Sequence, residues 1–156
     1  MKKISYEQIE EFYKQKRVAI IGLSRKEKTY SRGLFTELKK RDYEIIPVNP
    51  NAEEIDGIAC VADISKIDPA PSAAYILTTT RSIDSLVDEC MSKGIKHIWY
   101  YTGKDKSESL WKISENCQRH GINFIFGQCP FMFLKDTSFP HKFHGFIMKL
   151  MGQYPV

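Results

Sequence analysis

The sequence lacks the features that mark most secreted, membrane-spanning and metal-binding proteins. It has four cysteines, and none of them forms a C-x-x-C pair or stands at metal-ligand spacing from a histidine. Residues 1–17 contain no apolar core of the kind that a signal peptide has, and no apolar run approaches the roughly 18 residues of a membrane span. We therefore expect a cytoplasmic protein with reduced thiols and no metal site.

A dense basic run is also missing. The formal net charge is +4, and the lysines and arginines are spread along the chain, so we expect no nucleic-acid partner. The mild positive excess favours small anionic ligands instead. A length of 156 residues with 42% hydrophobic content suits one domain with a substantial core.

The common nucleotide-binding and catalytic motifs are absent as well. The glycine after Gly22 is Gly33, so the spacing is not G-x-G-x-x-G, and the chain has no Walker A or G-x-S-x-G motif. Cys129 follows a predicted strand, and two interpretations stay open for it: a structural Cys-Pro turn or a reactive thiol. No base stands at a recognisable spacing from it, so we predict no catalytic residues.

Apolar strands alternate with amphipathic helices along the chain. Ser5 and Gln8 form a capping-box pattern, Ser31 is the candidate N-cap of the second helix, and Pro47 is unusual for a central strand. The alternation predicts an α/β fold, a doubly wound, Rossmann-like parallel sheet of about five or six strands. The expected strands are residues 17–21, 43–50, 72–80, 95–101 and 122–127, and the expected helices are residues 4–16, 31–42, 81–94 and 107–121.

Small, hydroxyl and amide residues gather where the predicted strands end, which is where open parallel sheets bind ligands. Gly22 would let the backbone approach a ligand, and a helix opening at Ser31 would offer N–H groups to a pyrophosphate. Mobile positive charge would come from Arg25, Lys26, Lys28 and Arg32. The candidate binding residues are Gly22, Leu23, Ser24, Arg25, Ser31, Arg32, Asn49, Pro50, Thr78, Thr79, Thr80, Arg81, Thr102 and Gly103.

The order of these segments resembles the CoA-binding domain family, small Rossmann-like proteins related to the nucleotide-binding domain of the succinyl-CoA synthetase alpha subunit. The segments are VAIIGLS, the helix start at Ser31, YEIIPVNP, a strand ending in Thr80-Arg81, GIKHIWYYTG and a final CP. The resemblance covers about residues 14–130. It implies that residues 22–24 and the helix start hold the CoA pyrophosphate. It also implies that Asn49-Pro50 and residues 78–81 line the groove for the nucleotide or the pantetheine.

The chain departs from the family in two places. Tyr100 and Tyr101 stand where members commonly have a glutamine or a similar residue, and the chain continues to Val156, whereas most members end soon after the CP pair. The synthetase subunit uses a phosphorylated histidine in a second domain. None of the four histidines matches that role, so ligase chemistry is not carried over; they are His97, His120, His141 and His144.

The last stretch of the chain has a helical apolar pattern of its own. Five residues fall on one stripe: Phe143, Phe146, Ile147, Leu150 and Met151. We expect residues 140–152 to form a helix that packs on the domain or on a second subunit, which would make a homodimer, rather than on a membrane. The predicted division is a binding domain of residues 1–130 and a helical extension of residues 131–156.

Three functions from different classes follow from these patterns. The first is non-catalytic binding of CoA or an acyl-CoA, as a sensor or carrier. The second is an NAD(P)-dependent oxidoreductase or redox sensor, which is disfavoured because Asn49-Pro50 replaces the acidic residue that holds the ribose. The third is an interaction protein that kept the fold and lost the ligand, which the small-residue strand ends disfavour.

Overall fold

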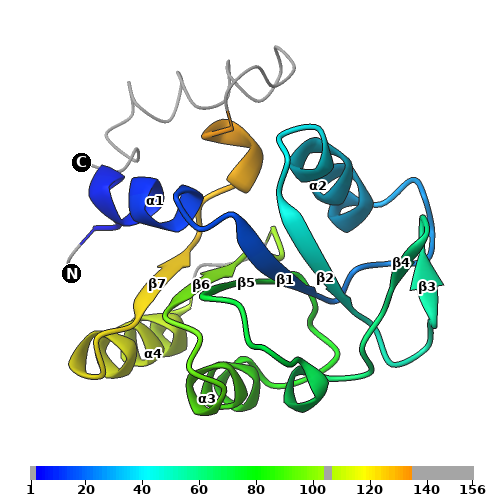
Figure 1. Cartoon of the computed structure of the whole chain (residues 1–156). Helices are drawn as coiled ribbons and strands as arrows, with labels where there is room; N and C mark the ends of the chain where they lie inside the picture. Colours follow the sequence, from blue (N-terminus) through cyan, green and yellow to red (C-terminus); the bar gives the residue numbers. More distant parts are fainter. Residues whose placement is uncertain (1–2, 104–106, 135–156) are drawn as a thin grey trace.

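The computed structural model describes residues 3–103 and 107–134 (Figure 1). Its centre is a five-stranded parallel sheet with the order β2-β1-β5-β6-β7, which confirms the predicted Rossmann-like α/β fold. Helices α1 and α2 cover one face of the sheet, and α3 and α4 cover the other. The strands of the sheet are β1 (Arg17–Ile21), β2 (Glu44–Val48), β5 (Ala73–Ile76), β6 (His97–Tyr100) and β7 (Asn123–Phe126).

The four helices begin and end close to where the sequence predicts. The predicted capping box starts α1: the Gln8 N–H donates to the Ser5 hydroxyl at 3.2 Å, and the Ser5 N–H donates to the Gln8 side chain at 3.0 Å. Gly94 and Gly121 follow the ends of α3 and α4 with φ of 80° and 67°, a conformation that glycine adopts without strain. The helices are α1 (Tyr6–Tyr13), α2 (Tyr30–Lys39), α3 (Ile83–Ser92) and α4 (Glu108–Arg119).

The core lies between the sheet and the two helix layers. Every residue of β5 is buried, because helices cover both faces of the sheet. On the α1 side, the Phe12 ring meets the Tyr75 ring at 4.8 Å and the Trp99 ring at 5.2 Å, so α1 is fixed over the middle of the sheet. This packing fixes the positions of the strands, and therefore of their carboxyl ends, relative to one another.

Pro47 lies in β2, which is an outer strand and not a central one. The outer side of β2 carries a bridge between Val48 and Val61, and the Val61 N–H donates to the Pro47 carbonyl at 3.0 Å. A small antiparallel hairpin precedes Val61 in the chain, formed by β3 (Glu54–Ile55) and β4 (Ile58–Ala59). The missing N–H of proline is therefore tolerated where the main sheet ends.

The packed domain continues a little past residue 130. A short 3-10 helix, η2 (Pro130–Met132), follows β7, and both Met132 and Leu134 are buried. The predicted helix at residues 140–152, and with it most of the proposed extension, lies outside the described residues. No helix within residues 3–103 and 107–134 is long and apolar enough to cross a membrane.

Candidate functional site at the carboxyl ends of the strands

The loops that follow β1 and β5 meet at the carboxyl edge of the sheet. From β1 the chain crosses to β2 on one side, and the later strands are added on the other side, so the crevice between β1 and β5 is the topological switch point. Gly22 and Thr78, both predicted site residues, lie side by side here. A Cβ atom at Gly22 would lie 2.7 Å from the Thr78 Cβ, and Gly22 has a φ of +89°. The close approach that Gly22 permits is therefore to Thr78 itself.

The loop between Gly22 and α2 folds back on the first turn of the helix. The Ser24 N–H donates to the Ser31 hydroxyl at 3.0 Å, and the Lys26 N–H donates to the Ser24 hydroxyl at 3.1 Å. The expectation that Ser31 is the N-cap is wrong: Thr29 holds that position, and its side chain makes no capping hydrogen bond. Ser31 instead uses its hydroxyl to shape the loop. The first N–H groups of α2 are thus left without a side-chain cap.

Arg32 is buried and acts within the protein. Its guanidinium donates to the Arg25 carbonyl at 3.1 Å and to the Ser24 carbonyl at 3.4 Å, and it forms an ion pair with Asp56 at 2.7 Å. Asp56 belongs to the turn of the β3–β4 hairpin. Arg32 therefore ties the loop after β1 to that hairpin, and its charge is already engaged.

The remaining cations of this loop are exposed. Arg25, Lys26 and Lys28 form no ion pair with any residue in the described part of the chain. Because these three side chains are in solvent next to the uncapped start of α2, they are the positive charges of the loop that a ligand can reach. The sequence alone did not show that these three cations are exposed and that Arg32 is buried.

Asn49 links the loop after β2 to the loop after β1. Its side-chain amide donates to the Leu23 carbonyl at 2.8 Å, and its side-chain oxygen accepts from the Asn51 N–H at 2.7 Å. Pro50 follows as an exposed residue. The polar atoms of the Asn49 side chain are thus used to hold the two loops together at the crevice.

The turn after β5 has hydroxyl groups near the crevice and a cation that points elsewhere. The Thr78 and Thr80 hydroxyls lie 2.9 Å apart, and the Thr80 N–H donates to the Thr78 hydroxyl at 3.2 Å. Arg81 is paired with Glu89 of α3, and this hydrogen bond raises the Arg81 pKa. Thr79 is exposed. Among the residues of this turn, the threonines rather than Arg81 are available at the crevice.

The loop after β6 is described only in part. Thr102 is half-buried and Gly103 is exposed, and residues 104–106 lie outside the described part of the chain. Both residues follow β6 directly, so they stand on the same edge of the sheet as the other candidates.

An aromatic ledge, which we define as Tyr30, Tyr101 and Phe131, adjoins this edge and was not predicted. The Tyr30 ring lies 5.1 Å from the Tyr101 ring and 5.2 Å from the Phe131 ring. The Tyr30 hydroxyl lies 3.4 Å from the Cys129 sulfur, and burial raises the Tyr30 pKa far above its ordinary value, so this phenol is neutral. The available signal was that Tyr101 directly follows β6 and Phe131 closely follows β7.

Cys129 is buried next to Tyr30 of this ledge. Only 7% of the residue is exposed. The Tyr30 hydroxyl lies 3.4 Å from its sulfur and is no base. The surroundings favour the structural interpretation of the Cys-Pro turn. Among the described residues, no group of three or more histidine, cysteine, aspartate or glutamate side chains is placed to hold a metal ion.

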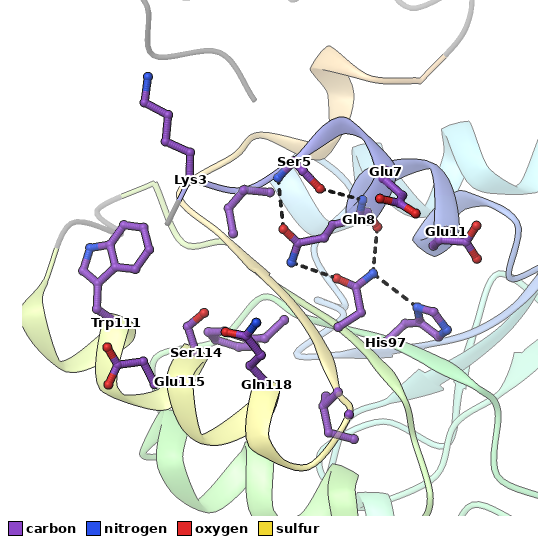
Figure 2. Close-up of a pocket in the computed structure, with 15 residues that line it drawn as sticks. Lys3, Ser5, Glu7, Gln8, Glu11, His97, Trp111, Ser114, Glu115 and Gln118 are labelled. Atoms are coloured by element: carbon purple, nitrogen blue, oxygen red, sulfur yellow. Dashed lines mark hydrogen bonds between the residues drawn. The ribbon is translucent and has the colours of Figure 1, made fainter. Parts of the chain in front are cut away.

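A cleft of about 670 Å³ lies at the opposite ends of β6 and β7, between α1 and α4 (Figure 2). Asn123 sits in a network here: its amide donates to the Gln8 carbonyl at 2.7 Å, and its side-chain oxygen accepts from the Gln8 side chain at 3.2 Å. The Asn123 amide also lies 3.3 Å from Nδ1 of His97, whose pKa is lowered by burial.

The charges of this cleft are mostly negative. Glu7 and Glu11 of α1 and Glu115 of α4 line it, whereas Lys3 is its one lysine among the described residues. None of the predicted binding residues lies in this cleft. A ligand that carries several phosphates would meet carboxylates here, so the cleft is a poor match to the predicted ligand.

Comparison with known proteins identifies the family of the chain. A family model described as a CoA binding domain matches residues 16–135, so the chain belongs to this family. The chain is 30% identical over 120 residues to an ADP-forming acetate–CoA ligase of Methanocaldococcus jannaschii; the match covers 73% of this chain and 17% of that protein. It is 25% identical over 102 residues to the uncharacterized protein YneT of Bacillus subtilis, covering 65% and 76% of the two chains.

The solved structures that resemble this one support the fold alone. A hypothetical protein from Pyrococcus horikoshii superimposes with a TM-score of 0.69 at 22% identity, covering 80% of this chain and 85% of that one. The chain spans less than a fifth of the first two ligases that it matches, 17% and 19% of their lengths. The ligase activity of those longer proteins therefore does not follow from the match.

Proposed function

We propose that the protein binds CoA or an acyl-CoA at the carboxyl edge of the sheet and does not itself catalyse a reaction. The observation that carries the proposal is the family match over residues 16–135, which includes every candidate binding residue. The geometry adds a second support. The loop after β1 lies at the switch point, next to an uncapped helix start and three exposed cations.

The pyrophosphate would lie against residues 22–24 and the first turn of α2. Backbone N–H groups at a helix start, together with the positive end of its dipole, suit an oxyanion. Arg25, Lys26 and Lys28 would supply mobile charge for the pyrophosphate and the 3′-phosphate of CoA. In this arrangement Ser31, Arg32 and Asn49 act on the ligand indirectly, because their hydrogen bonds hold the loop in shape.

The rest of the ligand would follow the crevice between the other strand ends. Thr78, Thr79 and Thr80 offer hydroxyl groups on one side, and Thr102 and Gly103 continue the edge beyond β6. The aromatic ledge would border the pantetheine end. An apolar border of this kind suits the arm of CoA. Whether the ligand carries an acyl group is a question for binding measurements.

The proposed lack of catalysis rests on where the candidate groups lie. His97 is at the amino end of β6, whereas Cys129 follows the carboxyl end of β7, so this thiol and this imidazole stand at opposite ends of the sheet. A nucleophile needs a base within hydrogen-bond reach. A sensor or a carrier of CoA is the role that needs binding and nothing more.

The NAD(P) hypothesis finds less support. A nicotinamide cofactor is held by a carboxylate at the end of the second strand, and that position is Asn49, whose amide is engaged with Leu23 and Asn51. The third hypothesis, a partner-binding protein without a ligand, does not explain the exposed cations or the small residues at the ends of the strands.

A thermal-shift panel tests the proposal directly. The ligands are CoA, acetyl-CoA, longer acyl-CoAs, NAD, NADPH and ATP. A ligand at 100 times its dissociation constant should add about 2.7 kcal/mol to the free energy of unfolding. We expect CoA or an acyl-CoA to give the largest shift. A larger shift with NAD or NADPH would favour the oxidoreductase hypothesis, and no shift with any ligand would favour the third.

A further inference from the structure

A groove of about 810 Å³ runs along α1 at the point where the described chain reaches Leu134. It lies on a different side of α1 from the cleft in Figure 2, because the two have no lining residue in common. Tyr6 and Phe133 face each other in it, with ring centroids 6.3 Å apart in an edge-to-face arrangement. The apolar and aromatic lining consists of Tyr6, Ile9, Tyr13, Tyr43, Phe133 and Leu134.

The polar groups around this groove are already engaged. The Tyr13 hydroxyl donates to the Pro130 carbonyl at 2.7 Å, and the Tyr43 hydroxyl donates to the Tyr13 carbonyl at 2.8 Å. The rings therefore offer their apolar surfaces to the groove.

The cations at its rim are engaged too. Lys14 pairs with Glu11, Arg41 pairs with Glu37 at 2.7 Å, and the Lys16 ammonium lies 4.2 Å from the centre of the Tyr43 ring. The groove thus has little to offer an anionic ligand, and its chemistry suits an apolar, helical segment of protein.

We propose that residues 140–151 of the same chain occupy this groove as a helix, with their apolar stripe against α1. The stripe has five large apolar residues, and a short helix that contains Gly145 has little stability without a surface to pack on. As a helix the segment would be about 18 Å long, somewhat longer than the eight residues of α1, at about 12 Å.

The position of Leu134 explains the choice of this groove and of the same chain. Leu134 itself lines the groove, and only residues 135–139 separate it from the segment. Five residues reach at most about 17 Å, so the segment begins beside the groove. A short tether also gives an effective concentration in the millimolar range, which favours the chain's own segment over that of a second copy.

The groove is connected to the candidate ligand site. Tyr13 on its wall holds the Pro130 carbonyl, and Phe131 of the same short helix packs on Tyr30 at the start of α2. A segment packed on Phe133 and Leu134 would therefore hold η2 and the aromatic ledge in place. The segment would thus stabilise the ligand site through η2 and the aromatic ledge, without touching the ligand.

The test is paramagnetic relaxation in the full-length protein. A nitroxide is attached at Glu10→Cys, on the rim of the groove, in a background with Cys60→Ser, because the other three cysteines are buried. The matched control carries the nitroxide at Glu115→Cys, an exposed position of α4 in the other cleft. Methyl signals of Ile147 and Met151 report the position of the segment.

We expect strong broadening of both methyl signals from the label at residue 10 and at least tenfold weaker relaxation from the label at residue 115. Adding Ile147→Asp should abolish the broadening of the Met151 signal, while the signals of domain residues far from the groove and from η2 stay unchanged. Equal effects from both labels, or none from either, would overturn the proposal. A mixture of nitroxide-bearing and isotope-labelled chains completes the test: broadening there would show that a second copy supplies the segment, against the proposal.

Discussion

At the carboxyl ends of β1 and β5, the chain leaves backbone N–H groups, hydroxyls and three exposed cations next to one another. At the amino ends of β6 and β7, an open cleft is bordered by carboxylates and by an amide network whose members satisfy one another (Figure 2). Both regions border the same sheet. A phosphate-bearing ligand is selected by the charge and the donors of a site, so the size of a cleft alone is a poor guide to where CoA binds.

The largest expected effect concerns Gly22, which lies against Thr78 at the switch point. Gly22→Ala should lower the free energy of unfolding by about 2–4 kcal/mol, because it adds strain at a positive φ and a contact with Thr78. Gly94→Ala is the matched control: Gly94 has a φ of +80° and nothing within 4 Å of the added Cβ, so only about 1 kcal/mol of strain is expected. Urea denaturation measures both. Equal losses would mean that the contact with Thr78 contributes nothing.

Arg32→Met is expected to have the next largest effect. It leaves the Arg25 carbonyl without its donor and Asp56 without its cation, which should cost about 2 kcal/mol of stability and weaken CoA binding by loosening the loop. Lys112→Met, on the exposed face of α4, should change neither. Denaturation and titration calorimetry give the two quantities. Unchanged CoA affinity in a destabilised Arg32→Met protein would show that the contacts of Arg32 stabilise the fold but do not act on the ligand site.

A combined change of Arg25, Lys26 and Lys28 to glutamine tests the exposed cations. We expect about a tenfold loss in CoA affinity, since three solvent-exposed charge contacts together contribute about 1.4 kcal/mol, with little change in stability. The loss should shrink at high salt. Lys112→Gln with Arg119→Gln, on α4, is the control. If the control pair lowers CoA affinity as much, the effect is one of overall charge and not of this loop.

The smallest effect is expected at His97 in the opposite cleft. Burial lowers the pKa of His97 below its ordinary value of about 6.5, and the charge of Glu11 partly opposes this. The unfolded chain therefore binds more protons than the folded one just below pH 6.5, so this group makes the protein less stable as the pH falls through that range. His97→Gln should remove a small part of the acid sensitivity, measured by denaturation at several pH values, and leave CoA affinity unchanged. A change in CoA affinity would indicate that the ligand binds in the cleft between α1 and α4, against the proposal.

What the sequence predicted well depends on local spacing. The capping box at Ser5 and Gln8 and the alternation of strand and helix each involve residues within about one turn or one connection. These signals are independent of the rest of the fold, and all of them were confirmed. The parallel sheet follows from the alternation, because connections of this length require crossovers.

What the sequence could not predict depends on partners far apart in the chain. Arg32 looked like a ligand cation because its ion pair with Asp56 spans 24 positions. Ser31 looked like a cap because its bond to the Ser24 N–H comes from a loop that folds back. Tyr30, Tyr101 and Phe131 come together only when the edge of the sheet is assembled. A pattern in sequence identifies a chemical group, whereas its partner decides whether that group remains available.

The Arg32–Asp56 ion pair connects the β3–β4 hairpin to the loop after β1, which is a separate part of the chain. If the loop after β1 exchanges between a shaped form and a loose one, only the shaped fraction can bind, and the apparent dissociation constant rises as that fraction falls. Asp56 is itself in the left-handed region, with a φ of 47°, so the tether depends on one unusual backbone conformation in a two-residue turn. Sequence change in that turn would tune the occupancy of the ligand site by altering a population, with every ligand-contacting residue left as it was.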